Sequence, residues 1–144
     1  MTEPLTRGEQ LSRFLEHVPI VKTMGMHGDV KGDDMVCVLP FQDKLIGNST
    51  IKALHGGTIG TFLEMTAMAQ LFLVADVERP PRTINITVDY LRQGHAKDLY
   101  ARATVVKLGR RMASVRAEAW QSERDKPVAA LMAHFILGKR IGDA

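Results

Sequence analysis

The chain has 144 residues, of which 45% are hydrophobic and 24% charged, and its formal net charge at pH 7 is +3. These values are typical of a single globular domain, here residues 1–144, and they exclude an intrinsically disordered chain and a collagen-like repeat. The small positive excess and the 6% of aromatic residues argue against a nucleic-acid partner, and the single cysteine, Cys37, excludes a disulfide framework and a cysteine-based zinc site.

The first predicted element is an amphipathic helix over residues 6–18. Thr6 and Glu9 fit a capping box, in which the two side chains satisfy backbone donors of the first helical turn. Apolar residues then recur at helical spacing up to Val18, and Pro19 ends the pattern. Residues 1–10 are polar and lack the apolar core of a signal peptide, so a cytoplasmic protein is expected.

A long apolar helix dominates the middle of the chain. Two short strands over 24–30 and 35–39, with a turn between them, and a loop over 40–52 are predicted before it. The helix itself is expected over 55–77, and from Ala53 to Ala75 its only charged residue is Glu64. Its length approaches that of a membrane span, but a carboxylate near the centre of a lone span is costly. We therefore expect a helix buried in protein and no membrane span.

The rest of the chain predicts four strands, over 84–90, 99–108, 112–121 and 128–137. The short polar turns between them favour an antiparallel meander. The order of elements predicts an α+β fold in which a curved antiparallel β-sheet wraps a long central helix. A second copy of the chain would cover the face of the helix that the sheet leaves open.

The candidate site lies at the start of the central helix, in the run Leu54-His55-Gly56-Gly57. Adjacent glycines leave the first N–H groups of the helix unobstructed, and these groups could polarise a substrate carbonyl oxygen. Glu64 lies about two turns from Gly57 on the same stripe, roughly 10 Å away along the helix axis. Both groups of one chain cannot reach one reacting carbon, whereas two antiparallel copies of the helix could bring Gly57 of one near Glu64 of the other.

Each of these residues also has a structural interpretation when it is taken alone. Glycine pairs before helices are common, and His55 can serve only as a capping or core residue. A lone carboxylate in an apolar helix can be an ion-pair partner or can face water. Their combination in a helix without other charge favours a function, and a buried Glu64 would suit a general base.

Several motifs occur in the order that one enzyme family shows. They are the His-Gly-Gly motif that begins at His55, an acidic residue nine positions later at Glu64, and the strand motifs at 88–92, 98–101 and 109–111. On these motifs the sequence resembles the hotdog-fold acyl-CoA thioesterases of the PaaI-like (phenylacetate-degradation) type, over about residues 39–137. The resemblance implies a hotdog fold, a homodimer or a tetramer built as a dimer of dimers, and hydrolysis of an acyl-CoA to the free acid and coenzyme A. We expect the acyl group to be a medium or long chain or an aryl group, and the methionines near Glu64 favour the chain. The resemblance implies no metal and no cofactor, since coenzyme A is part of the substrate.

The resemblance also implies roles for individual residues. The Gly57 N–H would polarise the thioester carbonyl, and Glu64 would act as general base or as nucleophile. His55 would help to bind or orient the thioester. Thr83 stands where relatives often carry a Ser or Thr that positions water.

One departure from the family pattern concerns the loop before the helix. The family often has Asn six residues before the His, but Ser49 occupies that position here and Asn48 lies seven before. Either the loop carries one extra residue or Ser49 takes part of the role, and Asn48 is kept as a candidate catalytic residue.

Other residues are expected to bind the substrate. Arginines in turns suit the phosphates of coenzyme A, and methionine suits an adaptable acyl pocket, although exposed arginines are usually solvated and methionine more often fills a core. The residues expected to bind substrate are Gly56, Met68, Arg92, Arg110 and Arg111.

Two other functions remain open from the sequence. A hotdog dehydratase or hydratase also pairs a His with an acidic residue, but it typically follows the His with Phe-Pro or an equivalent motif, which is absent here. A non-catalytic acyl-CoA-binding module with the same fold is the other alternative. The intact pair of His55 and Glu64 argues against that module.

Overall fold

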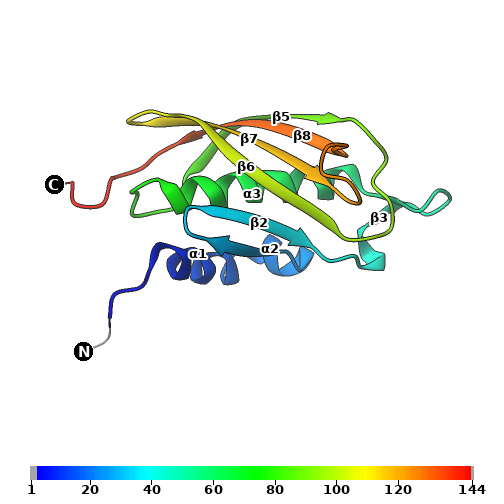
Figure 1. Ribbon diagram of the computed structural model, residues 1–144, viewed down its shortest axis with the longest axis horizontal. Coiled ribbons are helices and arrows are strands. Elements are labelled where there is room, and N and C mark those ends of the chain that lie inside the picture. The colour runs from blue at the N-terminus through cyan, green and yellow to red at the C-terminus, as the bar shows by residue number, and fades with distance from the viewer. Residues whose placement is uncertain (1–2, 144) are drawn as a thin grey trace.

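The structure is a computed structural model that describes residues 3–143. Within this range, a six-stranded antiparallel sheet curves around the central helix α3, and the shorter helices α1 and α2 lie beside strand β1 (Figure 1). The elements are α1 Arg7–Glu16, α2 Pro19–Met24, β1 His27–Lys31, β2 Asp34–Leu39, a short 3-10 turn Asp43–Leu45, β3 Ile46–Asn48, β4 Ala53–Leu54, α3 Gly56–Val74, β5 Arg82–Tyr90, β6 Leu99–Leu108, β7 Met112–Trp120 and β8 Ala129–Ile136. The predicted α+β architecture, a long helix wrapped by a curved antiparallel sheet, is confirmed.

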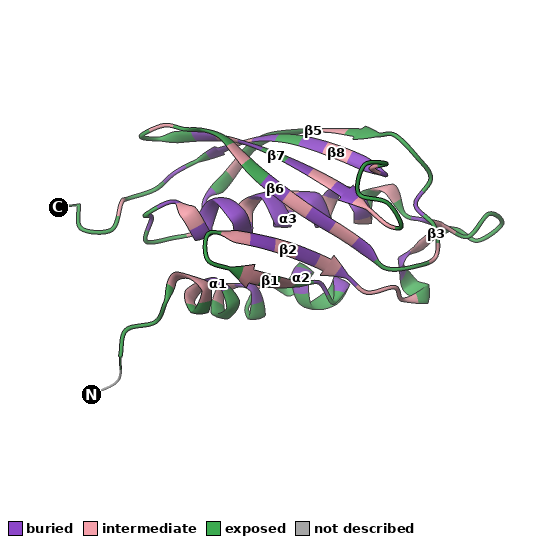
Figure 2. Ribbon diagram, in the orientation of Figure 1, coloured by how far each residue is buried: buried purple, intermediate pink, exposed green. Residues whose placement is uncertain are grey.

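The core lies between α3 and the concave face of the sheet. The inward positions of the strands are small or apolar, as in β7, where Ala113, Val115, Ala117 and Ala119 alternate with polar residues. Figure 2 shows α3 as a mostly buried helix and β5 as a largely exposed strand. By length and mean hydropathy α3 could cross a membrane, but 67% of its apolar window is buried inside the chain. It is the core helix of the fold.

The strand order differs from the predicted meander at β5. The sheet runs β1-β2-β6-β7-β8-β5, so the meander holds only for β6, β7 and β8. Strand β5 pairs with β8 because the connection after it crosses the end of the sheet, where Leu91 and Arg92 both donate their N–H groups to the Val128 carbonyl. Among the described residues no strand pairs with the other side of β5, so β5 is an open edge.

The N-terminal region forms two helices instead of the one predicted over 6–18. The capping box is confirmed, with Thr6 and Glu9 exchanging hydrogen bonds of 3.0 and 3.1 Å. Helix α1 ends at Glu16, two residues before the predicted bound, and Pro19 begins α2, because proline suits the first turn of a helix. Gly25 ends α2 with a φ of 78°, and the first strand therefore begins at His27 and not at residue 24.

Arg7 joins α1 to the C-terminal end of α3. Its guanidinium donates to the carbonyl oxygens of Phe72, Ala75 and Val77 at 2.7–2.9 Å, and it lies 3.9 Å from the centre of the Phe72 ring. Burial lowers the pKa of the Arg7 guanidinium, and the Asp76 carboxylate opposes this shift. These bonds satisfy carbonyl groups that a helix end leaves without partners.

The end of α3 also explains a difference in length. The helix ends at Val74, three residues before the predicted bound, because Ala75 is extended and Val77 forms a bridge with Arg140. At the other end of α3, the predicted loop over 40–52 contains the short strand β3, which pairs with β4. Gly47 in β3 lies against His55, and a Cβ there would be 2.7 Å from the His55 Cα atom, so only glycine fits.

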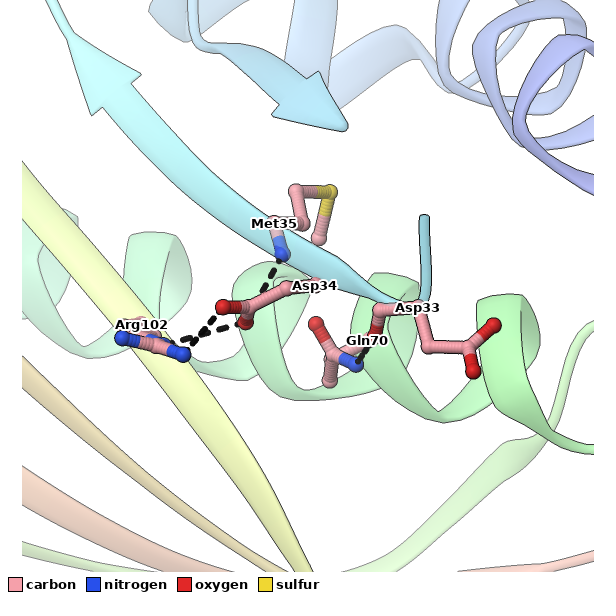
Figure 3. Close-up of polar contacts among 5 residues, drawn as sticks. All are labelled: Asp33, Asp34, Met35, Gln70 and Arg102. Atoms are coloured by element: carbon pink, nitrogen blue, oxygen red, sulfur yellow. Dashed lines mark hydrogen bonds and ion pairs between the residues drawn. The ribbon is translucent and has the colours of Figure 1, made fainter. Parts of the chain in front are cut away.

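Polar contacts attach the β1–β2 hairpin to the helix and to β6 (Figure 3). The Gln70 side chain of α3 donates to the Asp33 carbonyl at 2.7 Å, and Arg102 of β6 pairs with the Asp34 carboxylate. The Gln70 side-chain oxygen is buried and has no hydrogen-bond partner within residues 3–143. Of the two polar atoms of the Gln70 amide, the nitrogen alone therefore holds the hairpin turn against the buried helix.

Candidate active site

One stripe of α3 remains accessible between β5 and the N-terminal helices. Gly57 is exposed, and Glu64 and Met68 are half-buried, on the stripe that the helical spacing predicts. Gly60 and Leu71 lie on the same stripe but are buried. Thr61, three residues before Glu64, is also partly exposed, so the accessible part of this face presents a glycine, a threonine, a carboxylate and a methionine.

Glu64 forms a hydrogen bond with the edge strand. The Thr83 hydroxyl of β5 donates to the Glu64 Oε2 atom at 2.8 Å. Thr83 pairs with the fully buried Phe135 of β8, which places it on the face of β5 toward α3. In the single chain Glu64 is half-buried and not buried as expected, because β5 covers only one side of it.

His55 is the N-cap of α3. Its Nδ1 atom accepts a hydrogen bond from the Gly57 N–H at 2.9 Å, and its backbone is fixed to the Leu45 carbonyl at 2.8 Å. A neutral ring that accepts at Nδ1 carries its proton on Nε2, which is then available as a donor. The Gly57 N–H is thus placed at the helix start as predicted, but in this chain it is already engaged by His55.

Tyr90 is a residue of this region that the sequence reasoning did not single out. Its hydroxyl donates to the Gly56 carbonyl at 2.6 Å, and a Cβ at Gly60 would lie 3.2 Å from the same hydroxyl. The two glycines therefore form the surface on which the Tyr90 ring packs. Strand alternation, which puts Tyr90 on the same face as Ile86 and Val88, was the signal that could have found it.

Asn48 makes local contacts. Its side-chain oxygen accepts from the backbone N–H groups of Thr50 and Ile51 at 3.1 and 3.4 Å, and it therefore stabilises the turn between β3 and β4. Gly47, the residue before Asn48, lies against His55.

The structure does not bring the three predicted phosphate-binding arginines together in one chain. The Arg92 guanidinium donates to the Pro127 carbonyl at 2.8 Å, near the N-terminal end of α3. Arg110 and Arg111 are exposed in the β6–β7 turn, which lies at the opposite end of the sheet (Figure 1). The order of residues in the sequence could not predict that Arg92 and the Arg110–Arg111 pair lie at opposite ends of the sheet.

Other reactive side chains have no evident part in the site. Burial raises the pKa of the Cys37 thiol to about 11, so the thiol is protonated and inert near neutral pH. Over residues 3–143, no group of three His, Cys, Asp or Glu residues is placed to hold a metal ion.

Comparison of the sequence with known families gives a match over residues 52–128, a little more than half of the chain, to a family model described as the thioesterase superfamily. A similar protein is the medium/long-chain acyl-CoA thioesterase YigI of Escherichia coli. It is 25% identical over 140 residues, which cover 87% of this chain and 89% of that protein.

Solved structures also resemble this chain. A protein from Chromobacterium violaceum shares 35% identity, with a TM-score of 0.74, over 92% of this chain and 93% of its own. The PaaI protein of Escherichia coli, from the phenylacetic acid degradation operon, superposes with a TM-score of 0.79 at 18% identity, over 93% of this chain and 95% of its own.

Proposed function

Since the chain belongs to the thioesterase superfamily and is a thioester hydrolase, we propose that it hydrolyses a medium- or long-chain or aryl acyl-CoA to the free acid and coenzyme A. Its architecture is the hotdog fold, and its structural neighbours include PaaI. The observation that carries the proposal is the hydrogen bond between Thr83 and Glu64 on the accessible stripe of the central helix. The relative YigI, named for medium- and long-chain acyl-CoA, supports the acyl class.

Glu64 supplies the catalytic carboxylate in this proposal. Thr83 holds the Oε2 atom, which leaves the other oxygen to act on the reaction. As a general base, that oxygen takes a proton from water, the hydroxide adds to the thioester carbon, and the C–S bond breaks as the proton passes to the departing thiolate. As a nucleophile, the oxygen itself adds to the carbon and expels the thiolate, and water then hydrolyses the acyl-enzyme anhydride.

Gly57 and His55 act on the other side of the thioester. The Gly57 N–H lies at the positive end of α3 and stabilises the negative charge that develops on the carbonyl oxygen. Because His55 Nδ1 accepts this N–H in the free chain, substrate binding must displace the ring or share the donor with it. The Nε2–H of His55 is then free to orient the thioester.

A second copy of the chain completes the site. Gly57 and Glu64 lie roughly 10 Å apart along one helix, too far for both to act on one carbon. The open edge of β5 and its exposed apolar residues Ile84, Ile86 and Tyr90 offer a surface for a two-fold partner. We propose a homodimer, or a tetramer built as a dimer of dimers, that works in the cytoplasm without a metal or cofactor.

The test is a panel of acyl-CoA substrates of increasing chain length, with an aryl acyl-CoA, assayed on wild type and on Glu64→Gln. The expected result is hydrolysis by wild type and a loss of roughly 100-fold or more in the variant, because a neutral amide is neither a base nor a nucleophile. Glu16→Gln, an exposed residue of α1, is the matched control. Equal rates for wild type and Glu64→Gln across the panel would refute the role of Glu64.

Mixed oligomers test the shared site. His55→Ala and Glu64→Gln are each expected to be impaired alone. If a site uses His55 of one protomer and Glu64 of its partner, a mixture of the two variants contains dimers with one intact site and regains activity. If each site lies within one chain, mixing restores nothing.

A further inference from the structure

Three segments that are distant in sequence meet at the C-terminal end of α3. They are the connection from α3 to β5, the β6–β7 turn and the segment that follows β8 (Figure 1). The backbone hydrogen bonds that join them are Glu78 N to Lys139 O at 3.0 Å, Leu137 N to Arg111 O at 2.7 Å and Ile141 N to Asp76 O at 2.8 Å. The Arg140 guanidinium adds a bond of 2.8 Å to the Gly109 carbonyl.

Positive charge is concentrated at this end of the molecule. Residues 75–82, 107–111 and 137–143 contain seven Lys and Arg residues and three acidic ones. The excess of four positive charges is larger than the net charge of +3 of the whole chain. The small overall charge therefore conceals one basic end and a remainder that is close to neutral.

A hollow of about 470 Å³ opens within this basic end. Arg79, Arg82 and Lys139 line it together with Glu78 and apolar or small residues. Its volume lies within the range of small-molecule sites, roughly 300–1,000 Å³. Within residues 3–143 the ion pairs are those of Arg102, Arg116 and Lys126, so the three cations of the hollow pair with no carboxylate there.

The hollow is one residue away from the catalytic hydrogen bond. Thr83 faces α3 and donates to Glu64, and the adjacent Arg82 belongs to the opposite face of β5, where it pairs with Ile136. The hollow and the Glu64 carboxylate therefore lie on the two sides of a single strand. A ligand with a reacting group at one end and negative charge at the other fits this arrangement.

We propose that the hollow formed by Arg79, Arg82 and Lys139 binds the phosphate groups of the coenzyme A part of the substrate while the thioester lies at Glu64. This inference rests on the proposed function. Coenzyme A carries its phosphates at the far end of the pantetheine arm from the sulfur, so the charges are held away from the reacting carbon. Guanidinium groups bind phosphate with two parallel hydrogen bonds, and Arg110 and Arg111 add to the positive field nearby.

The experiment compares two substrates that carry the same acyl group, one on coenzyme A and one on N-acetylcysteamine, which has no phosphate. The triple variant Arg79→Gln, Arg82→Gln and Lys139→Gln is expected to lower the ratio of kcat/KM for the coenzyme A substrate to that for the N-acetylcysteamine substrate by about tenfold or more at low salt. The control removes the same charge from the α1, α2 and β1 region by Arg13→Gln, Lys22→Gln and Lys31→Gln, and it should leave the ratio within about twofold of wild type.

An unchanged ratio in the triple variant, or an equal fall in the control, would overturn the proposal. Binding of free coenzyme A, measured by calorimetry, gives a second test that does not need turnover. The triple variant should bind free coenzyme A at least about tenfold more weakly than wild type, and equal binding would again refute the role of the hollow in phosphate binding. If wild type hydrolyses no thioester, the proposed function fails, while this binding comparison still decides the hollow.

Discussion

Replacement of Thr83 by valine removes the hydroxyl group and leaves the shape of the side chain nearly unchanged. Valine is nearly isosteric with threonine and suits a strand, so β5 should keep its backbone. The Glu64 Oε2 atom, however, loses the donor that lies at 2.8 Å in wild type. A hydrogen bond to a charged group contributes about 1.5–3 kcal/mol, and each 1.4 kcal/mol corresponds to tenfold. We therefore expect kcat to fall by roughly 10- to 100-fold in Thr83→Val.

The assay is steady-state hydrolysis of one acyl-CoA by three proteins: wild type, Thr83→Val and Thr83→Ser. Serine keeps the hydroxyl, and this variant should retain a rate within a few-fold of wild type. In the proposed mechanism Thr83 orients the Glu64 carboxylate and does not face the basic hollow, so the loss should appear in kcat with little change in KM.

A double mutant shows whether Thr83 acts through Glu64. In the Glu64→Gln background, Thr83→Val should cause little further loss, because the carboxylate that it orients is already absent. Equal rates for Thr83→Val and Thr83→Ser would refute the reasoning. So would a loss of the same size with and without Glu64.

Three further predictions concern stability. Arg7→Met should lower the free energy of unfolding by about 2–4 kcal/mol in chemical denaturation, since it removes three hydrogen bonds to carbonyl groups at the end of α3. Arg13→Met, at an exposed residue of α1, is the control, and an equal denaturation midpoint for the two variants would contradict this. Burial raises the pKa of the Cys37 thiol from 9.0 to about 11, so the unfolded chain loses the thiol proton first as pH rises. Up to about 3 kcal/mol of the free energy of unfolding should therefore be lost between pH 9 and 11. Cys37→Ala should lack this loss, and parallel profiles of stability against pH for the two proteins would exclude it. Gly60→Leu should lower the melting temperature because its Cβ would lie 3.2 Å from the Tyr90 hydroxyl. Gly138→Leu should leave the melting temperature unchanged, because a Cβ there has no atom within 4 Å. Equal effects of the two substitutions would contradict the close packing of Tyr90 on Gly60.

The predictable part of the site follows from helical periodicity. A helix of 3.6 residues per turn places Gly57 and Glu64 on one stripe whatever surrounds it, and the absence of other charge marks Glu64. The curved sheet was also predictable, because one sheet must cover an apolar helix on most sides. Thr83 was found only through the family resemblance, since nothing in its local pattern places it opposite a residue of another element.

Other features depend on long-range pairing that local patterns do not contain. The position of β5 beside β8 could not be derived from turn lengths, because the connection after β5 crosses the sheet. The basic hollow unites Arg79, Arg82 and Lys139, which lie up to 60 residues apart. The second role of Pro19 was missed because proline both ends one helix and begins the next.

The Arg7 contact and the strand order have a consequence for the synthesis of the chain. Arg7 bonds to carbonyls that follow it by 65 to 70 residues, and β2 and β5 both pair with strands from the last third of the chain. During translation, α3 therefore emerges before most of the sheet that covers it. Its apolar surface stays exposed until β8 is made, so the nascent chain should depend on chaperones until then, and truncation before Ala129 should yield aggregates and not a smaller folded protein.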